Sequence, residues 1–299
     1  MRTTAILVIL GCAASAIGLS WLYFRRYRLN RPPIGVINLY DIVFMIGGIV
    51  IIPYLYLWIP PWLVVGLLAL GTISLLSLLL EPVLRLPWLV WSITLALIGG
   101  DLVASYLWTT NSPAFLVINN GIMVLMVVGI TNLWAQSGLK ARDAALLAGA
   151  LILYDTIATA ILPLMGELFA RMMQLPLGTQ LAWPGDAGLA AIGLGDVLLA
   201  AVFPLVMRKA FGLRAGLVAL ISALTVLVGL SFLPIANLFP VMVVLGPVML
   251  VQYGWWRRAS GAERTTWQYL QTEPLREMSR TILAGQSRTS PPGVETGMS

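Results

Sequence analysis

Long apolar stretches follow one another along most of the chain, and they constrain its fold more than any other feature. The 299 residues are 59% hydrophobic and only 10% charged, which lies outside the range of ordinary soluble domains. A bilayer core about 30 Å thick is crossed by roughly 20 apolar helical residues. Nine such stretches occur, at about 4–24, 34–57, 62–80, 88–108, 114–135, 144–168, 187–207, 215–233 and 235–256. The sequence therefore predicts an all-α, polytopic membrane protein with nine transmembrane helices.

Positively charged residues determine the orientation predicted for these spans, because Lys and Arg are retained on the cytoplasmic side of a membrane. Sixteen of the 18 fall after predicted spans 1, 3, 5, 7 and 9, whereas Arg2 and Arg171 fall on the other side. We therefore expect an N-terminus outside and a C-terminus in the cytoplasm. The plasma membrane and the endoplasmic reticulum are not distinguished. Four arginines follow the first span, which is typical of an uncleaved signal anchor.

The chain is predicted to have three parts. Residues 1–135 form an N-terminal five-helix part, residues 136–256 hold predicted spans 6 to 9, and residues 257–299 form a cytoplasmic tail. The end of the tail is rich in Ser, Pro and Gly, so part of it is expected to be disordered. The basic residues lie between apolar stretches and form no patch, so the expected partner is the lipid bilayer, and no nucleic acid is expected.

The chain contains no histidine, and this absence limits its possible chemistry. A Ser/His dyad, a His-Glu-x-x-His zinc site and the Glu/His schemes of membrane proteases all need an imidazole. These mechanisms are excluded, which leaves paired carboxylates as a means of hydrolysing amides within a membrane. No metal or other cofactor is expected. Cys12 is the only cysteine, so the chain has no intrachain disulfide.

Four acidic residues lie well inside predicted spans, where a carboxylate is costly and is by default a functional candidate. They are Asp41, Asp101, Asp155 and Asp196. Asp155 follows Asp143 by twelve residues, and Asp196 precedes Arg208 by twelve. At 1.5 Å per residue, both lie about 18 Å from the cytoplasmic side, on consecutive antiparallel helices. The matched depth predicts that Asp155 and Asp196 are catalytic partners that share a proton.

The other two acids are mismatched in depth by about 9 Å and form a poorer pair. For Asp41, the alternative to a functional role is a helix-end acid that reaches the arginines after the first span. For Asp101, the alternative is a buried acid bonded to Asn119 or Asn120 of predicted span 5. A second role in gating or hydration is left open for both.

The residues beside the favoured pair form short motifs. Tyr154 supplies a hydroxyl next to Asp155, and Gly193-Leu194-Gly195 precedes Asp196. Two glycines allow the backbone to approach another helix or to bend. Alone, this pattern is weak, since small residues are common wherever membrane helices pack.

Together these motifs resemble those of the presenilin and signal peptide peptidase family of intramembrane aspartyl proteases. Tyr154-Asp155 is similar to the family's YD motif, and Gly193–Asp196 is similar to its GxGD motif. The family also has nine spans and a Pro-Ala-Leu motif in the ninth, where this chain reads Pro240-Val241-Met242. Val241 and Met242 depart from that motif, and Pro234-Ile235-Ala236 is a rival alignment.

The resemblance implies an intramembrane aspartic endopeptidase in which Asp155 and Asp196 are catalytic. It implies that Tyr154, Gly193–Gly195 and Pro240–Met242 form motif and substrate-binding segments. The predicted orientation is that of signal peptide peptidases, and the short connection between predicted spans 6 and 7 implies no maturation cleavage. The implied substrates are transmembrane peptides or signal peptides. The sequence does not define the oligomeric state.

Two other classes remain as alternatives. A proton- or cation-coupled transporter or channel would use all four buried aspartates as a relay. A prepilin-type peptidase also uses Gly-x-Gly-Asp, but a Lys usually follows that motif, whereas Val197 follows it here. The transporter explains four buried acids, and the protease explains the motifs around two of them.

Overall fold

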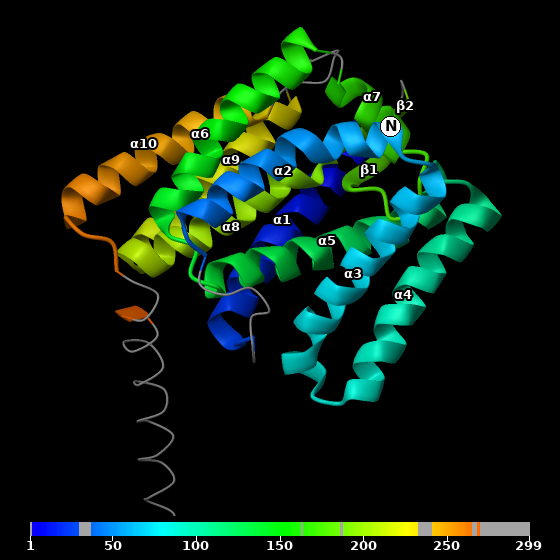
Figure 1. The fold of residues 1–299 in the computed structure, drawn as a ribbon, viewed down its shortest axis with the longest axis horizontal. Coiled ribbons are helices and arrows are strands. Elements are labelled where there is room, and N and C mark those ends of the chain that lie inside the picture. Colours follow the sequence, from blue (N-terminus) through cyan, green and yellow to red (C-terminus); the bar gives the residue numbers. More distant parts are fainter. Residues whose placement is uncertain are drawn as a thin grey trace, which may run out of the picture.

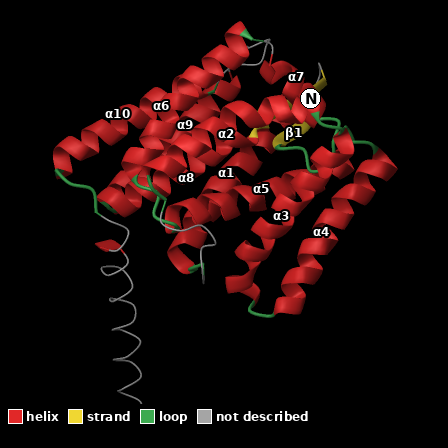
Figure 2. Ribbon diagram, viewed as in Figure 1, coloured by secondary structure: helices red, strands yellow, loops and turns green. Residues whose placement is uncertain are grey.

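The computed structural model describes residues 2–29, 37–162, 164–185, 188–232, 241–264 and 268–269, and most of them are helical (Figures 1 and 2). The α-helices are α1 (Arg2–Arg26), α2 (Leu39–Trp58), α3 (Pro61–Leu84), α4 (Pro87–Trp108), α5 (Pro113–Gln136), α6 (Ala141–Thr156), α7 (Leu164–Met172), α8 (Leu194–Phe211), α9 (Leu213–Phe232) and α10 (Met242–Ser260). A π-helical turn, η1 (Ile157–Ile161), follows α6. Strands β1 (Gln180–Gly185) and β2 (Gly188–Gly193) form an antiparallel hairpin.

Local residues explain several helix starts. Pro61, Pro87 and Pro113 each occupy a first helical position, where the missing N–H would have no intrahelical partner and the fixed φ suits a helix. The Asn38 side chain accepts from the Tyr40 and Asp41 N–H groups and so caps α2. These residues separate consecutive apolar helices and set their ends.

Within the described residues, six helices are long and apolar enough to cross a membrane, namely α1 to α5 and α9. The bent pair formed by α6 and α7 would make a seventh. At predicted span 7, α8 carries Asp196, Arg208 and Lys209 within 18 residues. At predicted span 9, α10 ends with Arg257 and Arg258 in its last turn. A mostly helical, multi-pass membrane protein is therefore confirmed, whereas a count of nine spans is not.

The prediction of uninterrupted helices at 144–168 and 187–207 is wrong. The first breaks after η1, and α7 leaves at 88° to α6. The second begins as strand β2, and its helix starts only at Leu194. Hydropathy alone cannot distinguish an apolar strand from a buried helical segment. The chain is otherwise helical, and the one short hairpin is its only sheet within the described residues.

The remaining boundaries agree better. Predicted spans 1 to 5 and 8 match α1 to α5 and α9 to within a few residues. Predicted span 9 starts at 235, but 233–240 lies outside the described residues, and α10 begins at Met242. Most of the predicted tail, 257–299, also lies outside them.

The helix α8 lies in the interior and packs against α1, α5, α6 and α9. Most of its residues from Val197 to Ala210 are buried in one hydrophobic core shared with these helices. Even its buried Lys209 has partners, because its Nζ donates to the carbonyl oxygens of Ala135 and Leu139. These lie at or just after the C-terminal end of α5, where carbonyl groups lack helical partners and favour a cation.

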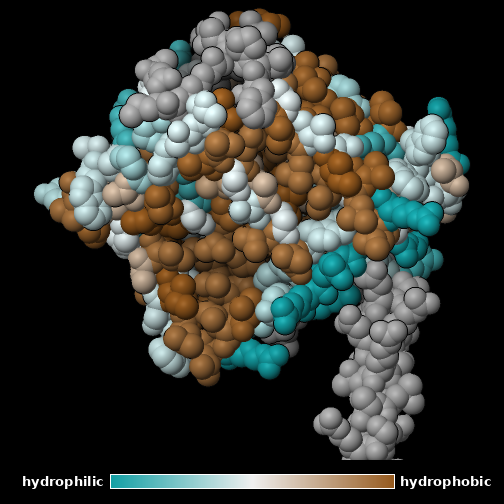
Figure 3. All heavy atoms as spheres, turned by 180° about the vertical axis from the view of Figure 1, so that it is seen from behind, coloured by the Kyte–Doolittle hydropathy of each residue, from teal (hydrophilic) through white to brown (hydrophobic). Residues whose placement is uncertain are grey.

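The helices α2, α3 and α4 lie toward the outside and expose apolar side chains. Phe44 is 86% exposed, Trp58 92% and Tyr106 89%. A broad hydrophobic surface covers much of the face in Figure 3. Exposed apolar surface of this extent is what a bilayer requires of the helices that face it.

Candidate catalytic site

Asp155 lies in the last turn of α6, immediately before the π-helical turn. In this turn the Leu162 N–H bonds to the Ile157 carbonyl, five residues back, an arrangement that frequently marks functional sites. The Thr159 hydroxyl, one turn further on, donates to Asp155 Oδ1 over 3.2 Å. The Met242 N–H donates to Oδ2, also over 3.2 Å. One carboxylate oxygen thus accepts a hydrogen bond from η1, which follows α6, and the other accepts one from α10.

Asp196 is the third residue of α8, at the junction between the hairpin and the helix. Gly193 ends β2 and is also the N-cap of α8. The Asp196 carboxylate folds back toward this cap, since a Cβ at Gly193 would lie 3.4 Å from Oδ2. The positive end of a helix dipole favours an anion at this place. The glycine motif therefore lies where the strand changes into the helix. At Gly195 there is room for a side chain, since a Cβ there would meet nothing within 4 Å.

The two aspartates come together because α6 packs against α8, and α10 packs against both. Asp155 is a source of like charge for Asp196, so having both carboxylates ionised at once is unfavourable. Met242, which is buried, adds the start of α10 to the same point. Segments predicted to lie in spans 6, 7 and 9 thus meet, with Val241 as the N-cap of α10. Pro240 lies outside the described residues.

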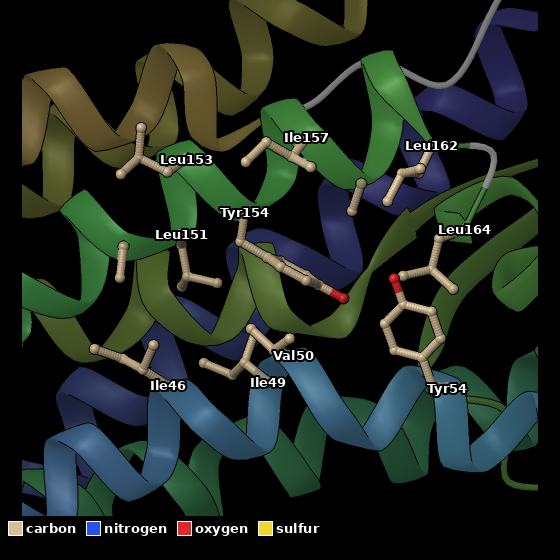
Figure 4. A pocket seen from close by; sticks show the side chains of 12 residues that line it. Ile46, Ile49, Val50, Tyr54, Leu151, Leu153, Tyr154, Ile157, Leu162 and Leu164 are labelled. Carbon is tan, nitrogen blue, oxygen red and sulfur yellow. The ribbon is translucent and has the colours of Figure 1, made fainter.

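Tyr154 points into a cavity between α2 and the α6–η1 segment (Figure 4). Its hydroxyl is buried and has no hydrogen-bond partner among the described residues. The Tyr54 side chain of α2 points toward it across the cavity. Tyr154 and Asp155 are neighbours in the sequence. The Asp155 oxygens, however, accept hydrogen bonds from Thr159 and Met242.

The cavity has a volume of about 370 Å³ and an almost wholly aliphatic lining. Its residues come from α2, α6, η1 and the first turn of α7, with Tyr54 and Tyr154 as the aromatic members. This volume lies within the range of small-ligand sites, which are mostly apolar with a few polar groups. An apolar side chain placed here would lie beside the break that follows Asp155.

Side chains of α5 hold the hairpin that leads to Asp196. The Asn120 side chain accepts from the Ala182 N–H over 3.0 Å and donates to the Ala182 carbonyl over 2.8 Å. It therefore bonds β1 much as a neighbouring strand would. Asn119 donates to the Gly178 carbonyl over 3.2 Å. The strand β1 pairs with β2, and β2 leads to Asp196. The bonds from α5 to β1 therefore also hold β2 in place.

Asp101 supports the same segment from α4. Its side chain is fully buried, and Oδ2 accepts the Leu177 N–H over 2.7 Å. Leu177 has a φ of 57°, a left-handed conformation that is costly for a residue with a branched side chain. The expected bond from Asp101 to Asn119 or Asn120 is not the one formed: all three residues bind the backbone of 177–182 instead.

Asp41 is only partly buried and lies in the first turn of α2. Its Oδ2 accepts the Asn38 N–H over 2.8 Å and completes a capping box with Asn38. A helix-end role is therefore observed, with Asn38 as the local partner. Arg31, one of those arginines, lies outside the described residues.

Sequence reasoning missed Thr159, Tyr54 and the hairpin. Thr159 lies four residues after Asp155, and this helical spacing could have identified it. Tyr54 comes from a distant helix and carries no sequence signal. Among the described residues, no three acidic or cysteine side chains are placed to hold a metal ion.

Comparisons with known proteins leave this geometry without a relative: no family model, no curated protein and no solved structure matches the chain. The likeness to presenilins and signal peptide peptidases therefore rests on the motif residues themselves. The function has to be argued from how those residues are arranged.

Proposed function

We propose that this chain is an intramembrane aspartyl protease of the presenilin and signal peptide peptidase type. The observation that carries the proposal is the meeting of three separate segments at one point. The carboxylate of Asp155 is bonded by Met242 and acts electrostatically on Asp196. The three motifs lie far apart in the sequence, and a purely structural role for each would not require them to meet.

The chemistry is general acid–base hydrolysis by a pair that holds one proton. The ionised aspartate accepts a proton from water as the oxygen attacks the scissile carbonyl carbon. The protonated aspartate donates its proton to the carbonyl oxygen, which gives a neutral tetrahedral diol. Collapse of the diol returns one proton to the pair and transfers another to the departing amine. Asp155 and Asp196 titrate as a unit, so neither role belongs to one residue.

The hairpin suggests how a substrate is presented. A transmembrane helix hides its amides in internal hydrogen bonds, so it must be unwound before cleavage. Within the described residues the sheet has two strands, and β2 runs directly into Gly193 and then Asp196. An unwound substrate segment could pair with the outer edge of β2, as peptides do on other exposed sheet edges. Its scissile bond would then be held near the two carboxylates.

The substrate's side chains fit the apolar cavity between α2 and α6. The aliphatic lining suits residues of a membrane helix, and the unpartnered Tyr154 hydroxyl offers a hydrogen bond to an exposed backbone group. Transmembrane peptides and leftover signal peptides are thus the proposed substrates.

The full topology of nine crossings is part of the proposal. With 18 residues, α8 is about 27 Å long, nearly the thickness of a bilayer core. Contacts also link the basic helix ends: Leu29 bonds Gln136, Lys209 bonds Leu139, and the Arg264 N–H bonds the Ala210 carbonyl. We place this end in the cytoplasm and the N-terminus outside, by the positive-inside rule.

A transporter that passes ions along all four aspartates is less well supported. Asp101 is bonded to the Leu177 backbone and Asp41 to the Asn38 backbone. Both therefore have roles in holding the chain, which a relay does not need.

The deciding experiment reconstitutes the purified full-length protein in liposomes with a fluorescently labelled transmembrane peptide. Wild type should cleave the peptide, whereas Asp155→Asn and Asp196→Asn should not. Cleavage should also decline on both the acid and the alkaline side of an optimum, because the pair must hold one proton. Persistent cleavage by either variant would overturn the proposal. A wild type that never cleaves but dissipates an ion gradient would establish the transporter instead.

A further inference from the structure

A second cleft, of about 910 Å³, lies at the end of the molecule that carries most of the basic residues. It is bounded by the C-terminal ends of α1 and α3 and by the start of α4. None of these segments contributes to the apolar cavity beside Asp155. The cleft therefore has no part in the proposed cleavage reaction, and its volume lies within the range of small-ligand sites.

The polar lining of this cleft is mainly cationic. Arg26 and Arg28 come from the end of α1, and Arg85 ends α3, while Glu81 supplies the one carboxylate. All four side chains are exposed and so reach the solvent or headgroup region. Guanidinium groups bind phosphate through two parallel N–H donors. The three arginines therefore favour an anionic ligand, and a phosphate ester is an anion that guanidinium groups bind well.

The other walls of the cleft are apolar and continue onto the lipid-facing side of α4. Leu78 and Val90 line it together with Trp91, which is 51% exposed. Trp88 and Leu95 are 64% and 55% exposed and lie three and four residues from Trp91, on the same helix face. Tryptophan is enriched at the depth of lipid headgroups. A ligand in this cleft would have a charged end beside the arginines and an apolar end along α4.

We propose that this cleft binds an anionic phospholipid, with its phosphate at Arg26, Arg28 and Arg85 and an acyl chain along Trp91 and the exposed face of α4. Basic pockets between membrane helices bind such headgroups in other proteins. A free phosphate would satisfy the arginines, but the adjoining apolar surface of α4 favours a lipid. Figure 3 shows hydrophilic side chains bordering a wide hydrophobic surface. The proposal does not depend on the proteolytic function.

Lipid binding is tested on the delipidated full-length protein in detergent. Native mass spectrometry measures the binding of phosphatidylglycerol and, for comparison, phosphatidylcholine. The test variants are Arg26→Gln, Arg28→Gln and Arg85→Gln, singly and together. Arg25→Gln is the matched control, because Arg25 is exposed on the same turn of α1 but does not line the cleft. Thermal unfolding shows which variants are folded, and the single variants suffice if the triple variant is not.

The expected result is that phosphatidylglycerol binds more tightly than phosphatidylcholine. Each cleft substitution should weaken its binding about fivefold, while Arg25→Gln should leave it unchanged. Equal binding of the two lipids would overturn the proposal, as would equal losses in Arg25→Gln and the cleft variants. Displacement of the lipid by millimolar glycerophosphate would also overturn it, because the cleft would then be a site for soluble anions.

Discussion

Asp101 on α4 and Asp155 on α6 are both aspartates within apolar helices, but their surroundings differ in kind. The Asp101 carboxylate is fully buried, and a short 2.7 Å bond ties it to the backbone of Leu177. Asp155 is partly exposed and accepts two longer bonds of 3.2 Å, one from a hydroxyl and one from the start of another helix. It also lies on a helix that packs against the one that carries a second carboxylate, Asp196.

The difference shows that a carboxylate within a membrane span does not by itself indicate chemistry. Asp101 stabilises a left-handed turn that precedes the hairpin through its Oδ2 atom, while its Oδ1 atom is buried without a hydrogen-bond partner among the described residues. A site for hydrolysis needs carboxylates that can exchange protons with water and with each other. The contacts of each acid, rather than its depth, separate the two roles. Four experiments test the contacts of these acids and of the helices that carry them, in order of decreasing effect.

The same replacement at both positions should give opposite results. Asp155→Asn should reduce peptide cleavage by about 10²–10⁴-fold, because an amide cannot transfer the proton. Asp101→Asn should cleave nearly as well as wild type, since its side-chain oxygen still accepts the Leu177 N–H. Initial rates in liposomes measure both. A comparable loss in the two variants would remove the distinction between them.

Removal of the Asp101 side chain should affect the fold. Asp101→Ala leaves the Leu177 N–H buried without a partner, which costs about 1–3 kcal/mol. The free energy of unfolding in detergent should fall by this amount, and cleavage should fall with it as the hairpin loosens. Asp101→Asn is the matched control. Unchanged stability in the alanine variant would show that the turn does not need this bond.

The contact of α10 with α6 should be sensitive to a single methyl group. A Cβ at Gly246 would lie 2.6 Å or less from the Ile152 side chain, close to Asp155. Gly246→Ala should therefore destabilise the protein by about 1–3 kcal/mol. Gly254→Ala on the same helix meets open space and should not destabilise it. Adding Ile152→Ala should recover part of the loss, and non-additivity in a double-mutant cycle measures the contact.

Asp41 should show the smallest effect. Asp41→Ala removes one half of the capping box at the start of α2 and should cost about 0.5–1 kcal/mol. Cleavage should stay within a factor of two or so of wild type, because Asp41 makes its bonds within its own helix end. A large loss of cleavage with a normal unfolding midpoint would return Asp41 to the list of functional candidates.

Much of the architecture follows from local patterns. Apolar length predicts α1 to α5 and α9 closely, because each of these helices is continuous and bounded by Pro, Asn or charged residues. It fails at 188–193, where an apolar run forms a strand. It also fails at 157–162, where a π-helical turn ends α6. Both failures lie beside the two aspartates, where tertiary contacts override local preference.

The sequence by itself determined which residues could carry the chemistry. The missing histidines exclude imidazole mechanisms, and the spacing of Asp155 and Asp196 from flanking charges predicts a common depth. Only the tertiary structure decided which partners those carboxylates have. Thr159 and the Met242 N–H reach Asp155, and the side chains of Asp101, Asn119 and Asn120 hold the segment that leads to Asp196. Hydropathy indicates which segments are apolar enough to leave water. It does not indicate which distant segments bond to each other, because those hydrogen bonds form only when the helices pack.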